Sequence, residues 1–69
     1  MEVRIKSIKK VTHGYGYDIY DVIVNTLPIG EVAKARLYNS CDRNNWGGSV
    51  LSCVKCVGGY LLAVKVYTD

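Results

Sequence analysis

Two adjacent glycines, Gly58 and Gly59, separate two segments near the end of the chain that are rich in β-branched and aromatic residues. The segments are VLSCVKCV, residues 50–57, and YLLAVKVYTD, residues 60–69. A Gly-Gly connection between two such segments is a strong signal of a β-hairpin, because glycine readily adopts the positive φ that a tight turn requires. We therefore expect an antiparallel sheet.

The first third of the chain predicts two more strands. Residues 2–11 alternate apolar and basic side chains, which is typical of a strand with one solvated face. Ile8 is out of phase, which indicates a bulge or the strand's end near Ser7. Residues 12–18, THGYGYD, carry two glycines and predict a hairpin loop. Residues 17–26 are apolar on both faces, as expected for a central strand or one covered on each side.

Residues 28–41 have a helical composition. Pro28 suits a helix start, and Glu, Ala, Lys, Arg and Leu follow it. At 100° per residue, one side of this helix collects five residues, Ile29, Val32, Ala33, Leu37 and Cys41. A rival interpretation takes the apolar-basic alternation over residues 33–37 as a strand, which would give an all-β five-stranded meander or small barrel. We favour a single α+β domain over residues 1–69, a small antiparallel sheet in the order ββαββ with one helix packed on it.

Composition places the chain among folded proteins of modest stability. It has 69 residues, of which 49% are hydrophobic and 22% charged, and a chain of this size hides only about 60% of its unfolded surface. No segment is long and apolar enough to span a membrane, and the N-terminus lacks the apolar core of a signal peptide. Three cysteines, an odd number, argue against a secreted disulfide framework. We expect a cytoplasmic protein that does not contact membranes.

The CxxC pair of Cys53 and Cys56 has the spacing of a zinc knuckle, and Cys41 and His13 would complete a Cys3His set. Residues three apart in a regular strand point to opposite faces, so the pair can share a metal only if the strand breaks. The Gly-Gly hairpin argues against a break. We interpret the cysteines as structural thiols and expect no metal or other cofactor, with a small zinc module as a third hypothesis for the function.

Catalysis is not indicated by any motif. His13 is the one histidine, no third group completes a nucleophilic triad with it, and the glycines match no phosphate-binding spacing. We therefore expect a protein that is not an enzyme.

Basic residues and tyrosines lie close together near the N-terminus. Arg4, Lys6, Lys9 and Lys10 fall within seven residues, and three tyrosines follow, Tyr15, Tyr17 and Tyr20. Single-stranded nucleic acid is bound by such a combination, in which bases stack on rings and cations hold phosphates. The net charge of +3 permits nucleic acid without requiring it, and nearby aspartates interrupt the positive field. Alternatively, the lysines are the solvated face of an edge strand, where they also block unwanted pairing.

The segment DRNNWGG, residues 42–48, presents Arg43, Asn45 and Trp46 together. Trp, Tyr and Arg dominate the hot spots of protein interfaces, and Asn adapts around them. Trp46 is either such a contact or a cover for the core of a chain that has no Phe. If it is a contact, the partner-binding residues are Tyr15, Tyr17, Arg43, Asn45 and Trp46, with Arg4 and Lys6 steering the approach.

In length, order of elements and surface composition, the chain resembles the small inhibitor proteins that phages make, such as certain anti-CRISPR proteins and inhibitors of host RNA polymerase. The resemblance implies a stoichiometric blocker, carried by a phage or mobile element, that covers a surface of a host nucleoprotein complex. The leading hypothesis is therefore a non-enzymatic protein that acts by protein-protein contact. Single-stranded nucleic-acid binding is the alternative, and the oligomeric state stays open.

Overall fold

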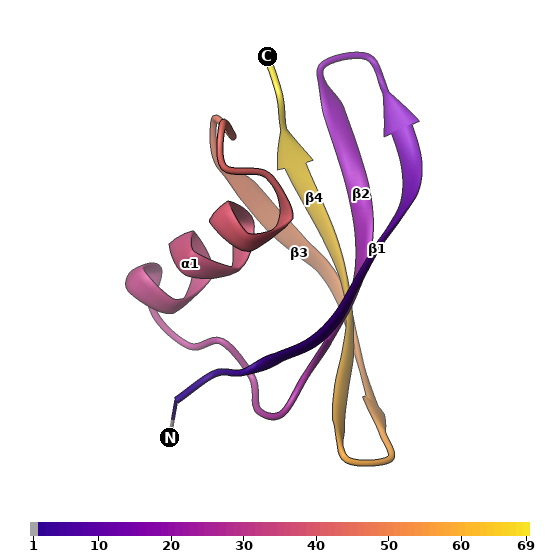
Figure 1. The fold of residues 1–69 in the computed structure, drawn as a ribbon, viewed down its shortest axis with the longest axis vertical. Helices are drawn as coiled ribbons and strands as arrows, with labels where there is room; N and C mark the ends of the chain where they lie inside the picture. Colours follow the sequence, from indigo (N-terminus) through magenta and orange to yellow (C-terminus); the bar gives the residue numbers. More distant parts are fainter. Residues whose placement is uncertain (1) are drawn as a thin grey trace.

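The computed structural model describes residues 2–69 and shows a four-stranded antiparallel sheet with one helix beside it (Figure 1). The elements in chain order are β1 (Ile5–Gly14), β2 (Tyr17–Val24), α1 (Glu31–Cys41), β3 (Gly48–Cys56) and β4 (Gly59–Tyr67). The predicted α+β fold in the order ββαββ is confirmed. The all-β alternative is wrong, because the segment in dispute forms the helix α1.

The strands lie in the order β1-β2-β4-β3, so the two hairpins join through their second strands. The prediction that residues 17–26 contain a central strand is confirmed by β2, which pairs with β1 on one side and β4 on the other. The predicted bulge near Ser7 is also confirmed, since the register of β1 against β2 shifts between Ile5 and Ser7. The shift returns Ile8 to the face that Ile5 occupies, opposite Val22.

The turn of the first hairpin is shorter than the predicted loop of residues 12–18. His13 pairs with Asp18 and Gly14 with Tyr17, which leaves only Tyr15 and Gly16 between the strands. Cross-strand pairing thus continues into a segment whose two glycines indicated a loop. Gly16 has a φ of 80°, the left-handed conformation that this turn needs.

The turn of the second hairpin lies one residue earlier than its Gly-Gly pair suggests. Cys56 pairs with Gly59, so Val57 and Gly58 form the turn and Gly59 begins β4. Gly58 has a φ of 82° and supplies the left-handed conformation. Gly59 is needed for a different reason, because a Cβ atom there would lie 1.9 Å from the carbonyl oxygen of Val24.

Helix α1 begins at Glu31, three residues later than the predicted start at Pro28. Gly30 precedes the helix with a φ of 91°, a conformation that no helical residue adopts. The Lys34 N–H donates to the Gly30 carbonyl oxygen at 3.2 Å. Pro28 is buried in the connection from β2 instead of opening the helix.

The core lies between the helix and one face of the sheet. It consists of Leu37 from α1 and of side chains that alternate along the two central strands, Tyr20, Val22, Val24, Leu62, Val64 and Val66. The predicted apolar side of the helix packs only in part. Leu37 is buried, but Ile29 and Val32 are 83% and 68% exposed.

Gly59→Ala tests the close approach of the two hairpins. The added methyl group would collide with the Val24 carbonyl, so the free energy of unfolding should fall by about 3 kcal/mol. Gly16→Ala is the matched control, since Gly16 also lies at a hairpin turn with a positive φ, of 80°, and a Cβ there would meet only the Asp69 side chain, at 3.8 Å. It should lose only about 1 kcal/mol, the cost of a left-handed alanine. Equal losses in urea unfolding would contradict this assignment.

Candidate functional site at the aromatic end of the sheet

Three chain segments lie side by side at one end of the sheet, where Figure 1 shows the β1–β2 turn, the C-terminus and the start of β3. The Trp46 N–H donates to the Tyr67 carbonyl at 2.8 Å, and the Tyr67 N–H donates to the Gly47 carbonyl at 2.9 Å. On the other side, the Thr68 N–H donates to the Gly16 carbonyl at 3.0 Å. These bonds bring together four aromatic residues that we call the aromatic end, Tyr15, Tyr17, Trp46 and Tyr67.

Two members of the aromatic end are almost fully open to solvent. Tyr15 is 98% exposed on the β1–β2 turn, and Trp46 is 77% exposed between α1 and β3. Trp46 is therefore not the cover of the core. Large apolar side chains held in this way are available for contact with a partner.

The other two members are fixed against the sheet. Tyr17 pairs directly with Tyr67 across β2 and β4, and the Tyr17 ring covers Gly14, where a Cβ atom would lie 2.2 Å from Cζ of the ring. The Lys65 ammonium lies 4.5 Å from the centre of the Tyr17 ring and 5.3 Å from that of Tyr67. This double cation-π contact joins the two rings on the sheet face away from the helix.

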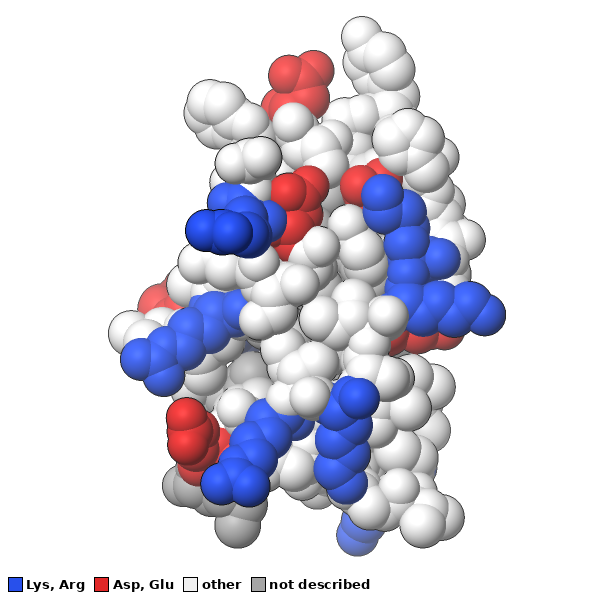
Figure 2. All heavy atoms as spheres, in the orientation of Figure 1, with Lys and Arg blue, Asp and Glu red and all other residues white. Residues whose placement is uncertain are grey.

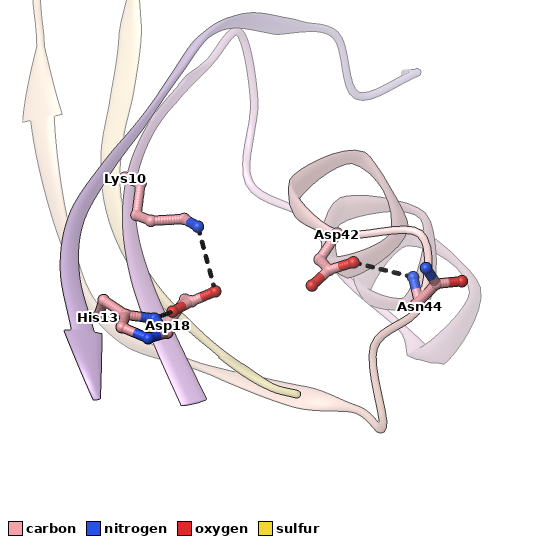
Figure 3. Close-up of polar contacts among 5 residues, drawn as sticks. All are labelled: Lys10, His13, Asp18, Asp42 and Asn44. Atoms are coloured by element: carbon pink, nitrogen blue, oxygen red, sulfur yellow. Dashed lines mark hydrogen bonds and ion pairs between the residues drawn. The ribbon is translucent and has the colours of Figure 1, made fainter. Parts of the chain in front are cut away.

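The loop that carries Trp46 is held by its own polar side chains. The Asn45 side-chain amide donates to Asn39 Oδ1 and to the Asp42 carbonyl, both at 2.7 Å, and its Oδ1 accepts from the Gly47 N–H at 3.0 Å. Asp42 Oδ1 accepts from the Asn44 N–H at 2.9 Å (Figure 3). Asn45 thus holds the backbone beside Trp46 in place. Its side-chain amide already forms hydrogen bonds inside the loop.

The predicted partner-binding residues divide between the two ends of the sheet. Arg43 is exposed in the same loop as Trp46. Arg4 lies just before the start of β1, where its backbone N–H donates to Asn25 Oδ1. The Lys6 ammonium donates to the Gly58 carbonyl in the β3–β4 turn at 2.6 Å. The structure therefore places Tyr15, Tyr17, Arg43, Asn45 and Trp46 on segments at one end of the sheet and leaves Arg4 and Lys6 at the opposite end.

Sequence reasoning missed Tyr67 and Lys65. In the sequence they are alternate positions of an ordinary strand. Only the pairing of β2 with β4 places them beside Tyr17, and no local pattern identifies that pairing.

Asp18 lies on the helix side of the sheet and is only 4% exposed. Its Oδ1 is 2.5 Å from His13 Nδ1, and its Oδ2 is 3.4 Å from the Lys10 ammonium (Figure 3). The hydrogen bond from His13 lowers the pKa of the Asp18 carboxyl; burial opposes this, and the Lys10 charge adds to it. The buried carboxylate thus engages two basic residues of β1.

The thiols and His13 do not converge on one point. Cys53 pairs with Leu62 and Cys56 with Gly59, which places the two cysteines on opposite faces of an unbroken strand, as predicted. Burial raises the pKa of the Cys41 thiol to about 11, so this thiol is protonated at neutral pH. Within residues 2–69, no three Cys, His, Asp or Glu side chains are arranged to hold a metal ion.

Comparisons with protein-family models, with curated proteins and with solved structures found no match to this chain. Among residues 2–69, the one helix is too short and too polar to cross a membrane.

Asp18→Asn tests the buried ion pair through its pH dependence. A lowered pKa in the folded state means that the ionised carboxylate stabilises the fold at pH values above the unfolded Asp pKa of about 3.9. This contribution is lost as the pH falls through the lower, folded pKa. The wild type should therefore be more stable than the variant at about pH 7, and the difference should shrink towards about pH 2 in urea unfolding.

Asp21→Asn is the control for that experiment. It makes the same change of charge on the opposite face of β2, at a residue that forms no ion pair with residues 2–69. Its stability should follow that of the wild type at every pH. A difference between wild type and Asp18→Asn that stays constant with pH would contradict the assignment.

Proposed function

We propose that this protein is a non-enzymatic binding protein that docks on a protein partner through the aromatic end. The observation that carries the proposal is the exposure of Tyr15 and Trp46 beside two tyrosines that the sheet holds in place. Rigid aromatic side chains contribute large contact areas and lose little conformational entropy on binding, so they dominate interface hot spots.

The size of the aromatic end suits such an interface. A specific interface takes about 800 Å² from each partner, which is about a sixth of the 4731 Å² surface of this chain. One end of the molecule can supply that area. Because Asn45 fixes the loop backbone and Lys65 contacts the Tyr17 and Tyr67 rings, the ordering left for binding is mainly that of the exposed Tyr15 and Trp46 side chains.

The charge distribution favours a protein over nucleic acid as the partner. Two of the lysines that suggest a phosphate-binding strand are engaged locally, because Lys10 pairs with Asp18 and Lys6 bonds to the Gly58 carbonyl. Lys9 forms no ion pair within residues 2–69, but its register partner across β1 and β2 is the acidic Asp21. On the face shown in Figure 2, basic side chains form small groups that uncharged surface divides from one another, and some groups lie beside acidic side chains. A continuous basic surface, which phosphate backbones require, is not formed on this face.

One observation supports the nucleic-acid alternative. Tyr17, Tyr67 and Lys65 place two rings and a cation together on the sheet face away from the helix, and bases stack on surfaces of this kind. The experiment on the partner must therefore separate the two possibilities.

For the class of partner, we extend the proposal to what the resemblance to phage inhibitors implies. The partner is then a protein surface of a host nucleoprotein complex in the cytoplasm, and binding blocks that surface stoichiometrically. Arg43, exposed in the same loop as Trp46, would contact an acidic group on that surface.

Trp46→Ala in a tagged pull-down from bacterial lysate tests the site. The variant should lose the retained protein partner, because truncating a central hot spot costs about 2 kcal/mol or more of binding free energy. Its own stability should change by only about 0.5 kcal/mol, since Trp46 is 77% exposed. Val57→Ala is the matched control, an apolar truncation at the fully exposed turn at the other end of the sheet, and should retain the partner.

Nuclease treatment separates the alternatives in the same experiment. A retained protein that survives nuclease and is lost with Trp46→Ala supports the proposal. Retained material that disappears with nuclease assigns the tyrosines and Lys65 to nucleic acid. A marked loss of stability in Trp46→Ala would instead indicate that Trp46 stabilises the fold, and it would contradict the assignment of Trp46 as a partner contact.

A further inference from the structure

The two edges of the sheet are protected to very different degrees. An edge strand presents unpaired N–H and C=O groups, which proteins shield with lysines and bulges. The β1 edge has both, with three lysines, at positions 6, 9 and 10, and register shifts at two places. The β3 edge carries one charged residue, Lys55, and one register shift, between Val50 and Ser52.

The open part of the β3 edge is a run of five residues, Leu51–Lys55, each of which is exposed. Before it, Gly48–Val50 are half-buried, and a Cβ at Gly48 would lie 2.9 Å from the Tyr38 ring of the helix. Leu51 is 53% exposed and Val54 is 59% exposed. The edge therefore carries a single charge, that of Lys55, and is partly apolar just where the helix stops covering the strand.

We propose that β3 pairs antiparallel with β3 of a second copy of this chain over Leu51–Lys55, with Cys53 opposite Cys53 of the second copy. The open run is centred on Cys53, so a two-fold axis at that residue pairs all five positions. Each copy then supplies the backbone donors and acceptors that the other lacks, and the two sheets join into one sheet.

The side chains fit a second copy in this register. Lys55 faces Leu51 of the second copy, and Ser52 faces Val54, so no like charges lie directly opposite one another. The same pairing of two β1 strands would bring several lysines together. The exposed apolar side chains of Leu51 and Val54 lose water contact at the new junction.

This dimer goes beyond the proposed function and is independent of it. Trp46 precedes β3, so the antiparallel arrangement places the two aromatic ends at opposite ends of the joined strands. Both would stay free to bind. A dimer of this shape would contact a repetitive partner at two points, which increases the apparent affinity.

Sedimentation equilibrium of the reduced full chain over a dilution series tests the dimer. The mass should approach twice 7.7 kDa as the concentration rises. Cys53→Lys places two like charges opposite each other and should weaken dimerisation about fivefold or more. Val57→Lys adds the same charge at the turn, outside the paired run, and should dimerise like the wild type.

Charge reversal keeps the test independent of folding defects. Cys53→Lys and Cys53→Glu should each remain mostly monomeric, and an equimolar mixture of the two should form dimers again. Circular dichroism of each variant verifies the fold. Dimerisation by Cys53→Lys alone at wild-type concentrations would overturn the proposed register.

Oxidation provides a second readout. Directly opposed residues of an antiparallel pair have Cα atoms about 4.5 to 5.5 Å apart, within the range of a disulfide. Mild oxidation should give a covalent dimer in the wild type and in Cys56→Ser, but not in Cys53→Ser. A chain that stays monomeric at every concentration, pairs only with a strand of another protein, or crosslinks through Cys56 would overturn the proposal.

Discussion

The pairing of β2 with β4 is the interaction on which the rest of the structure depends. It runs without a register shift over eight residue pairs, from Tyr17 with Tyr67 to Val24 with Tyr60, and it joins two hairpins that are far apart in the sequence. One face of this pair supplies every buried side chain of the sheet, and the other holds the two tyrosines beside Lys65. A chain this small has few other sources of stability, because the core within residues 2–69 contains only seven buried hydrophobic residues, and the sequence has no Phe. The same register therefore determines both whether the chain folds and what its open face presents.

The short helix determines which parts of the sheet remain accessible. Only Leu37 of α1 is fully buried, and Tyr38 reaches the start of β3 at Gly48. One side of the helix, from Val32 to Ser40, lines a groove of about 850 Å³ together with the start of the chain, and Val32 stays exposed there, as does Ile29 just before the helix. Residues Leu51–Lys55 are exposed, and β3 is the last strand of the sheet, so its outer edge pairs with no strand within residues 2–69. An unpaired edge thus remains in addition to the aromatic end.

Local signals in the sequence predicted the elements but not the way they assemble. The bulge near Ser7 and the helical composition after Pro28 are properties of neighbouring residues, and each was recovered in the structure. The first strand was recovered too, but its predicted single solvated face was not, because every residue from Lys6 to His13 is exposed. Turn positions were less accurate, because two adjacent glycines do not reveal which one needs a left-handed φ and which one needs space near Val24. Tyr67, Lys65 and the buried contacts of Asp18 depend on pairing across strands, which no short segment encodes. Exposure of Trp46 was likewise open in the sequence, since a chain without Phe gives equal reason to bury it.

The register of the first hairpin also weakens the positive charge of the basic segment at the N-terminus. In the sequence, Arg4 to Lys10 is a cluster of positive charge, and the aspartates that follow are several residues away. In the sheet, β2 returns antiparallel and places Asp18 beside Lys10 and Asp21 opposite Lys9. Short-range compensation of this kind weakens the field that phosphates would meet, while isolated cations elsewhere can still orient a partner at long range. Under the proposed function, most of the binding free energy would then come from apolar contact with the exposed rings of Tyr15 and Trp46.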